Sequence, residues 1–85
     1  MSTPIHQGSI EERVKKIVGD QFCRAPAEIN QTASLVLEYG MTDIDLIEIT
    51  MSTEDEFGIE IDDDTMYGIK TIQDVIDVVT QKVVA

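Results

Sequence analysis

The chain has 85 residues, enough for one small domain with a modest core, because globular domains rarely divide below about 100 residues. Its single cysteine, Cys23, cannot form a disulfide within the chain, which favours a reducing compartment. No apolar run approaches the ~20 residues of a membrane helix, and the N-terminus lacks the basic and apolar regions of a secretory signal. These features predict a soluble, cytoplasmic, monomeric domain.

The charge is strongly negative and unevenly distributed. The net charge is −11, and residues 25 to 69 contain twelve acidic residues but neither lysine nor arginine. Such a stretch repels nucleic acids and anionic membranes and attracts basic protein surfaces, so nucleic-acid binding is excluded and a basic protein partner is favoured. The alternative interpretation is a solvated acidic face that only keeps the protein soluble.

The first predicted helix follows a flexible lead-in of residues 1 to 8, and the folded domain is expected to span residues 9 to 85. Ser9 and Glu12 have the spacing of a capping box, and the helix should end near Pro26. Its apolar positions recur at helical spacing: Ile10, Val14, Ile17, Val18 and Phe22. A long loop to residue 41 is then expected, with Leu35, Val36 and Leu37 packed over the core.

The second predicted helix runs from Thr42, as N-cap, to Gly58, which suits a left-handed C-cap. Asp45 stands at the capping-box position, and early acids complement the positive end of the helix dipole. Ile44, Ile47 and Met51 are expected to line one apolar stripe, widened by Leu46 and Ile49. This stripe predicts the side of the helix that packs on the core.

A short third helix is predicted over residues 62 to 66, and a last helix begins after Thr71, with Asp74 at its capping-box position. The apolar face of the last helix is rich in β-branched residues, so tertiary packing must hold it. Ile59 and Ile61 alternate with Glu60 but are too few for a sheet. The sequence therefore predicts an all-α fold, a small four-helix bundle with three main helices, one short helix and a long loop after the first helix.

Residues for catalysis or metal binding are scarce. His6 is the only histidine and lies in the lead-in, which argues against a Ser-His-Asp or Cys-His arrangement and against a closed zinc site with Cys23. The acidic run from Asp62 fails the EF-hand pattern, because Tyr67 stands at the sixth position, where glycine is needed. The sequence predicts neither an enzyme nor a metal site.

Three stretches resemble the acyl carrier protein family: SIEERVKKIVGDQF from residue 9, YGMTDIDLIEITMSTEDEFGIEIDDD from residue 39, and IKTIQDVIDVVTQKV from residue 69. The resemblance implies a four-helix bundle with a long first loop. It also implies a serine at the start of the second helix that receives 4′-phosphopantetheine from coenzyme A and carries acyl chains in fatty acid or polyketide biosynthesis.

Counting back from Phe57 places Asp43 at that serine position. Because a carboxylate would form a labile acyl phosphate, we expect Asp43 to remain unmodified and this chain to carry no cofactor. Thr42 is better suited to capping, and Ser52 lies too far along the helix. The chain is then a carrier in a form that cannot be loaded, through natural loss or engineered replacement of the serine. The alternative is an interaction or regulatory module that binds a basic partner enzyme without carrying an acyl chain.

The resemblance also implies a docking surface for carrier-handling enzymes such as phosphopantetheinyl transferases, acyltransferases and ketosynthases. The residues carried over to partner binding are Asp43, Ile44, Asp45, Glu48, Met51, Glu54, Asp55 and Glu56. A second set is expected to line the bundle interior: Ile44, Leu46, Ile47, Met51, Ile59, Ile61, Ile69, Ile72 and Ile76. For Ile44 and Met51, a position at the rim in contact with a partner is the alternative.

Overall fold

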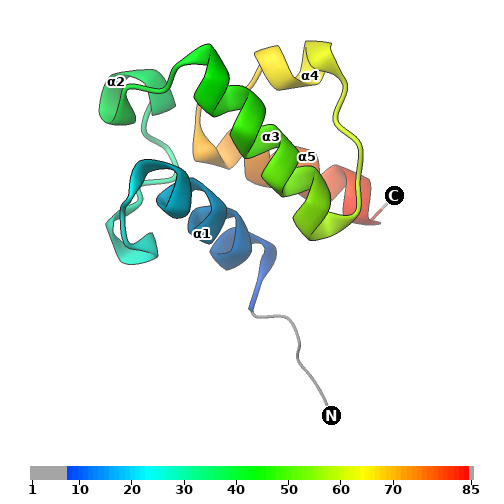
Figure 1. Cartoon of the computed structure of the whole chain (residues 1–85). Coiled ribbons are helices and arrows are strands. Elements are labelled where there is room, and N and C mark those ends of the chain that lie inside the picture. Colours follow the sequence, from blue (N-terminus) through cyan, green and yellow to red (C-terminus); the bar gives the residue numbers. More distant parts are fainter. Residues whose placement is uncertain (1–7, 85) are drawn as a thin grey trace.

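The computed structural model describes residues 8–84 and is all-helical (Figure 1). Its elements in chain order are α1 (Ile10–Phe22), η1 (Pro26–Glu28), α2 (Leu35–Tyr39), α3 (Asp43–Phe57), α4 (Asp63–Tyr67) and α5 (Ile72–Val84). The predicted all-α fold with three long helices is confirmed. The predicted lead-in, including His6, lies outside the described residues apart from Gly8.

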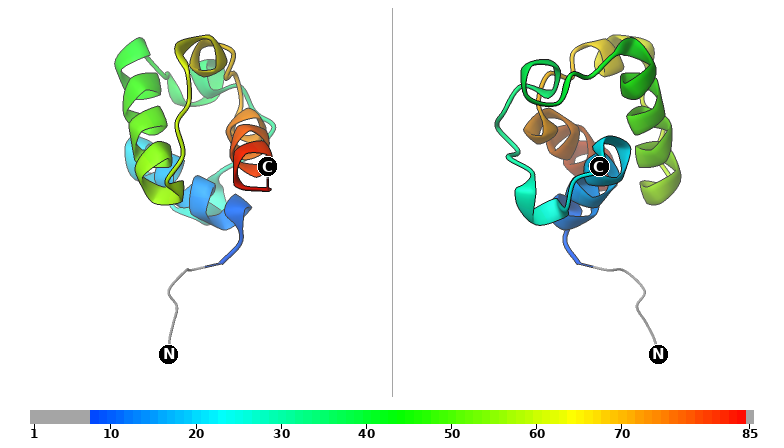
Figure 2. Two further views of the ribbon diagram at one scale, coloured as in Figure 1. Left: turned by 90° about the vertical axis from the view of Figure 1, so that its right-hand side faces the viewer. Right: turned by 60° about the vertical axis from the view of Figure 1, so that its left-hand side comes forward.

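The three long helices surround a single core, with α1 packed against both α3 and α5. Figure 2 shows α3 and α5 as two sides of the bundle and α4 across one end. The intrinsic helix propensity of α5 is weak, so its stability comes from burying its β-branched side chains against the other long helices. The buried apolar residues are Val14, Val18, Ile29, Leu35, Leu46, Ile49, Ile61, Met66, Ile69, Ile72, Val75, Ile76 and Val79.

The starts of the long helices follow their sequence signals. Ser9 and Glu12 form the predicted capping box, with the Glu12 N–H donating to Ser9 Oγ at 3.1 Å and the Ser9 N–H to Glu12 Oε1 at 3.0 Å. Thr71 and Asp74 exchange the same pair of bonds at 3.0 and 3.1 Å. Gly58 ends α3 with φ of 64°, as predicted. Local capping thus fixes helix boundaries.

The end of α1 shows why the chain turns so tightly after it. The helix ends at Phe22, and Cys23 adopts a left-handed conformation with φ of 58°. The Arg24 N–H then donates to Gly19 O at 2.8 Å. A Cβ on Gly19 would lie 2.5 Å from Arg24 O, so this close passage requires glycine.

The connection between α1 and α3 contains more structure than predicted. It holds η1 and the one-turn helix α2, which Ser34 caps by accepting from the Leu37 N–H at 3.1 Å. Leu35 is buried, but Val36 and Leu37 are 53% and 87% exposed, so the prediction that all three pack over the core was wrong for these two. Successive helical residues point about 100° apart, which lets only one of the three face inward.

Backbone hydrogen bonds attach this connection to the start of α5. The Leu35 N–H donates to Lys70 O at 2.9 Å, and the Gln73 N–H donates to Gln31 O at 2.8 Å. Ser34 and Thr71 form an isolated bridge, and residues 8–84 contain no strand. Among the helices of residues 8–84, none is long and apolar enough to cross a membrane.

Candidate functional site

Helix α3 carries two apolar stripes on opposite sides. Leu46, Ile49 and Thr53 have the same spacing as Ile44, Ile47 and Met51, and the two sets are offset by two residues, about 200° around the helix. The first set is buried. The second set, although more hydrophobic, is 68%, 41% and 57% exposed. The more apolar side of α3 therefore faces solvent.

The exposure of Ile44, Ile47 and Met51 corrects the prediction that they line the interior. Equal spacing made the two stripes indistinguishable by periodicity, and packing against α1 and α5 selected the one that contains Thr53. For Ile44 and Met51 the structure matches the alternative position at the rim. Ile59 is only half-buried, whereas the other predicted interior residues are buried as expected: Leu46, Ile61, Ile69, Ile72 and Ile76.

Asp43 is the first residue of α3 and is exposed. The preceding hydroxyl, on Thr42, is held in the helix cap. Thr42 Oγ1 accepts from the Asp45 N–H at 3.2 Å and donates to Asp45 Oδ2 at 3.1 Å, while the Thr42 N–H donates to the same carboxylate at 3.0 Å. The Thr42–Asp45 box confirms the prediction and leaves Asp43 outside the cap.

Two carboxylates of α3 share one donor from α1. The side-chain amide of Gln21 donates to Asp45 Oδ1 at 2.9 Å and to Glu48 Oε1 at 2.7 Å. The Thr42 backbone N–H, followed by the Gln21 amide, lowers the pKa of Asp45 below its ordinary value. Gln21 was not among the predicted site residues. It lies seven residues, about two helical turns, after Val14 on the buried side of α1, and this position is the signal that could have indicated it.

The other predicted docking acids divide into two groups. Glu54 and Glu56 are engaged within the fold: Glu54 Oε2 accepts from the Ile61 N–H at 2.7 Å, and Glu56 Oε2 pairs with Arg13 Nε at 2.9 Å. Asp55 is exposed. Ile44, Glu48, Met51 and Asp55 recur at intervals of four, three and four residues, so they share one exposed face, which we call the α3 outer face.

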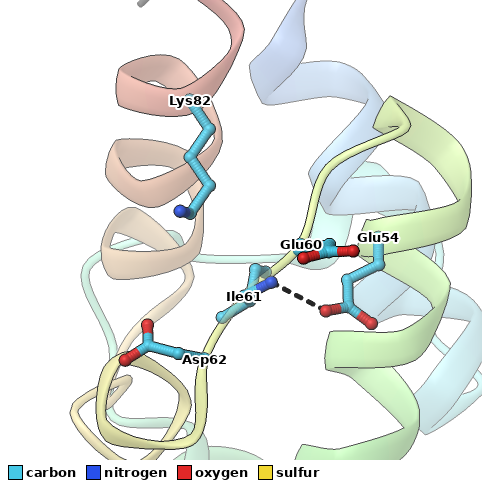
Figure 3. Close-up of a pocket in the computed structure, with 5 residues that line it drawn as sticks. All are labelled: Glu54, Glu60, Ile61, Asp62 and Lys82. Carbon is cyan, nitrogen blue, oxygen red and sulfur yellow. Dashed lines mark hydrogen bonds between the residues drawn. The ribbon is translucent and has the colours of Figure 1, made fainter.

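An acidic pocket of about 560 Å³ lies near the C-terminal end of α3 (Figure 3). Glu54, Glu60 and Asp62 line it together with Lys82 from α5. The Thr65 hydroxyl, with a further contribution from the Lys82 charge, lowers the pKa of Asp62. Within residues 8–84 no group of three or more His, Cys, Asp or Glu side chains is placed to hold a metal ion.

Comparisons with known proteins agree with this architecture. The family described as "Phosphopantetheine attachment site" matches residues 12–79. Acyl carrier proteins from two strains of Nitratidesulfovibrio vulgaris, DP4 and Hildenborough, are each 45% identical over 74 residues, covering 87% of this chain and 97% of the relative. The chain therefore belongs to the acyl carrier protein family.

A solved structure gives the same fold. The acyl carrier protein from Enterococcus faecalis superposes with a TM-score of 0.73 at 23% identity, over 86% of this chain and 92% of that one. At this identity the likeness concerns the fold alone.

Proposed function

We propose that this chain is a member of the acyl carrier family that docks on carrier-handling enzymes through the α3 outer face but does not accept phosphopantetheine. The observation that supports docking is the exposure of the more apolar stripe of α3 beside carboxylates. An apolar centre with a charged rim is the usual composition of a protein interface, and the charges steer association. The proposal assigns no catalytic residue.

The residue at the attachment position does not fit the phosphopantetheine group. A carboxylate is a weaker nucleophile than a serine oxygen activated by a base, and its product with a phosphoryl group is a mixed anhydride that water cleaves. The Thr42 hydroxyl, the nearest alternative, is occupied in the cap with Asp45. We therefore derive no step through the arm, and Asp43 serves as an exposed first-turn charge that complements the helix dipole.

The partners that fit this surface are the basic faces of phosphopantetheinyl transferases, acyltransferases and ketosynthases. Residues expected to contact them are Asp43, Ile44, Asp45, Glu48, Met51 and Asp55. Glu54 and Glu56, also predicted from the sequence, contribute their charge to the same end of α3 while holding Ile61 and Arg13. Binding should be moderate and sensitive to salt.

A second candidate function is a regulatory module that occupies such an enzyme without delivering a chain. Two observations support it: the outer face of α3 is exposed, and an aspartate stands at the position assigned to the attachment serine. The Asp43 carboxylate also supplies one negative charge at the assigned attachment position, which partly mimics the phosphate of the arm but lacks the pantetheine.

The deciding experiment is intact mass spectrometry after incubation with coenzyme A and a broad-specificity phosphopantetheinyl transferase. We expect no gain of mass for the native chain and one phosphopantetheine on Asp43→Ser. Modification of the native chain that disappears in Thr42→Val would make Thr42 the acceptor and refute the proposal. If neither the native chain nor Asp43→Ser is modified, the regulatory module becomes the better description.

A further inference from the structure

The short helix α2 exposes two large apolar side chains at the end of the molecule where α3 begins. Val36 and Leu37 are 53% and 87% exposed, and Leu37 is the most exposed large apolar residue among residues 8–84. Ile44, in the first turn of α3, is 68% exposed. Figure 1 shows α2 next to the first turn of α3, to which residues 40–42 connect it. This end of the molecule therefore carries exposed apolar side chains from two helices.

The backbone of α2 is held in one orientation by contacts at both ends. At its start, Ser34 Oγ accepts from the Leu37 N–H at 3.1 Å, and the Leu35 N–H donates to Lys70 O at 2.9 Å. At its end, the Met41 N–H donates to Leu35 O at 3.2 Å. Leu35 is fully buried, and Leu37 lies about 200° further around the helix, so the anchored turn directs Leu37 outward. A side chain presented by a fixed turn loses little conformational freedom on binding.

The charges around this apolar surface indicate which occupant it fits. Glu38 and Asp43 stand next to it in the sequence and are exposed, and residues 25 to 69 contain no lysine or arginine. Arg24 and Lys70 are engaged within the fold: Arg24 is stacked on an aromatic ring, and Lys70 Nζ donates to a backbone carbonyl oxygen at 3.4 Å. A second copy of the chain carries the same net charge of −11, which opposes self-association. The surface instead suits a protein face with an apolar pocket and a basic rim.

An enzyme that acts at residue 43 meets α2 as well as α3. Asp43 stands at the position assigned to the attachment serine, and only residues 40–42 separate it from α2. A protein interface of standard size covers about 800 Å² on each partner, far more than one turn of a helix offers. The face of such an enzyme therefore extends over both helices.

We propose that α2 is a second docking element of this chain, and that Val36 and Leu37 enter an apolar pocket, rimmed by lysine and arginine, on the enzyme that acts at residue 43. The inference rests on the proposed docking through the α3 outer face and adds two side chains that were expected in the core. It also makes α2 a determinant of specificity. An enzyme with polar groups opposite Leu37 would have to desolvate them without a partner, so it binds more weakly.

The test measures the Kd of a broad-specificity phosphopantetheinyl transferase for the native chain and for single variants by biolayer interferometry. Leu37→Gln keeps a high helix propensity but removes the apolar contact, so it should weaken binding about tenfold. Val36→Gln should weaken binding about threefold. The matched control is Val83→Gln in α5, because Val83 is 47% exposed and Figure 1 shows α2 and the C-terminal end of α5 on opposite sides of the molecule. This control should keep the native Kd.

Stability and salt dependence show whether the loss comes from the contact itself. All three variants should keep the native Tm, because the replaced side chains are exposed. The Kd of every variant should rise with salt, but the ratio between Leu37→Gln and the native chain should stay constant, because salt does not screen an apolar contact. A ratio that falls to one at high salt would indicate a purely electrostatic effect and would overturn the proposal.

Met51→Ala, on the α3 outer face, separates failure of this inference from failure of the proposed function. If Met51→Ala weakens binding and Leu37→Gln does not, α2 lies outside the interface and the inference is wrong, while docking through α3 stands. If neither variant weakens binding, both are wrong. Equal losses for Val36→Gln and Val83→Gln would indicate that only overall hydrophobicity matters, and would overturn the inference. A dimer of the native chain in analytical ultracentrifugation that Leu37→Gln abolishes would do the same, because a second copy would then cover α2.

Discussion

Helices α3 and α5 both carry large apolar side chains at helical spacing but place them differently. In α5 the apolar face packs inward: Ile72, Val75, Ile76 and Val79 are all buried. In α3 the more apolar stripe faces solvent, and the stripe containing Thr53 packs inward. Helix α5 buries its main apolar stripe, whereas α3 buries one apolar stripe and exposes another.

The difference shows what an amphipathic pattern can and cannot specify. A helix with one apolar stripe has one way to bury it, so the orientation of α5 follows from its sequence. A helix with two stripes of equal spacing can be buried on either side, and contacts from distant parts of the chain choose between them. An exposed apolar stripe of this kind is typical of surfaces that contact a partner or a ligand.

The largest predicted effect is a difference in the free energy of unfolding between a variant of α5 and a variant of α3. Ile72→Ala removes a fully buried side chain and should destabilise the protein by about 2–5 kcal/mol. Ile44→Ala removes an exposed side chain and should change the free energy of unfolding by no more than about 0.5 kcal/mol. Urea unfolding of both variants measures this difference.

A comparable loss of stability in the two variants would contradict the assignment of α3 stripes. The matched comparison on α3 itself is Ile49→Ala against Ile47→Ala, since Ile49 lies on the buried side and Ile47 on the exposed side. The free energy of unfolding should fall much further for Ile49→Ala.

The sequence predicted the elements that depend on local chemistry. The three capping boxes and the glycine that ends α3 are determined by residues within a few positions of each other, and all were confirmed. The exposure of Ile47 depends instead on how α3 rotates against α1 and α5, which no local pattern encodes. Gln21 was missed for the same reason, because its role depends on neighbours distant in sequence.

The second predicted effect concerns the function of the exposed stripe. In the Asp43→Ser background, Met51→Ala and Glu48→Lys should each reduce kcat/KM for loading by a phosphopantetheinyl transferase about tenfold, equal to ~1.4 kcal/mol. Met51→Ala should leave the Tm nearly unchanged because Met51 is exposed, and Glu48→Lys should lower it slightly because the hydrogen bond from Gln21 is lost. The loss for Glu48→Lys should shrink as salt increases, whereas the loss for Met51→Ala should persist.

Glu60→Lys is the control for the charge change, because Glu60 is exposed and lies beyond the end of α3. Equal losses for Glu48→Lys and Glu60→Lys would indicate that only the net charge matters. The α3 outer face would then have no specific role in docking.

The smallest predicted effect tests how α1 supports that face. Gln21→Met removes the amide that donates to Asp45 and Glu48, so the pKa of Asp45 should rise toward its ordinary value, as carbon-detected NMR titration can measure. Since the folded pKa of Asp45 is lowered, its stabilising effect is present above the unfolded pKa and is lost as the pH falls through the folded pKa. The Tm difference between the native chain and Gln21→Met should therefore be present at neutral pH and vanish in acid.

Gln81→Met, a matched change at an exposed position of α5, should leave the pKa of Asp45 unchanged. If Gln21→Met also leaves it unchanged, the Thr42 cap alone sets the charge state of Asp45, and α1 contributes packing but not electrostatics to the α3 outer face.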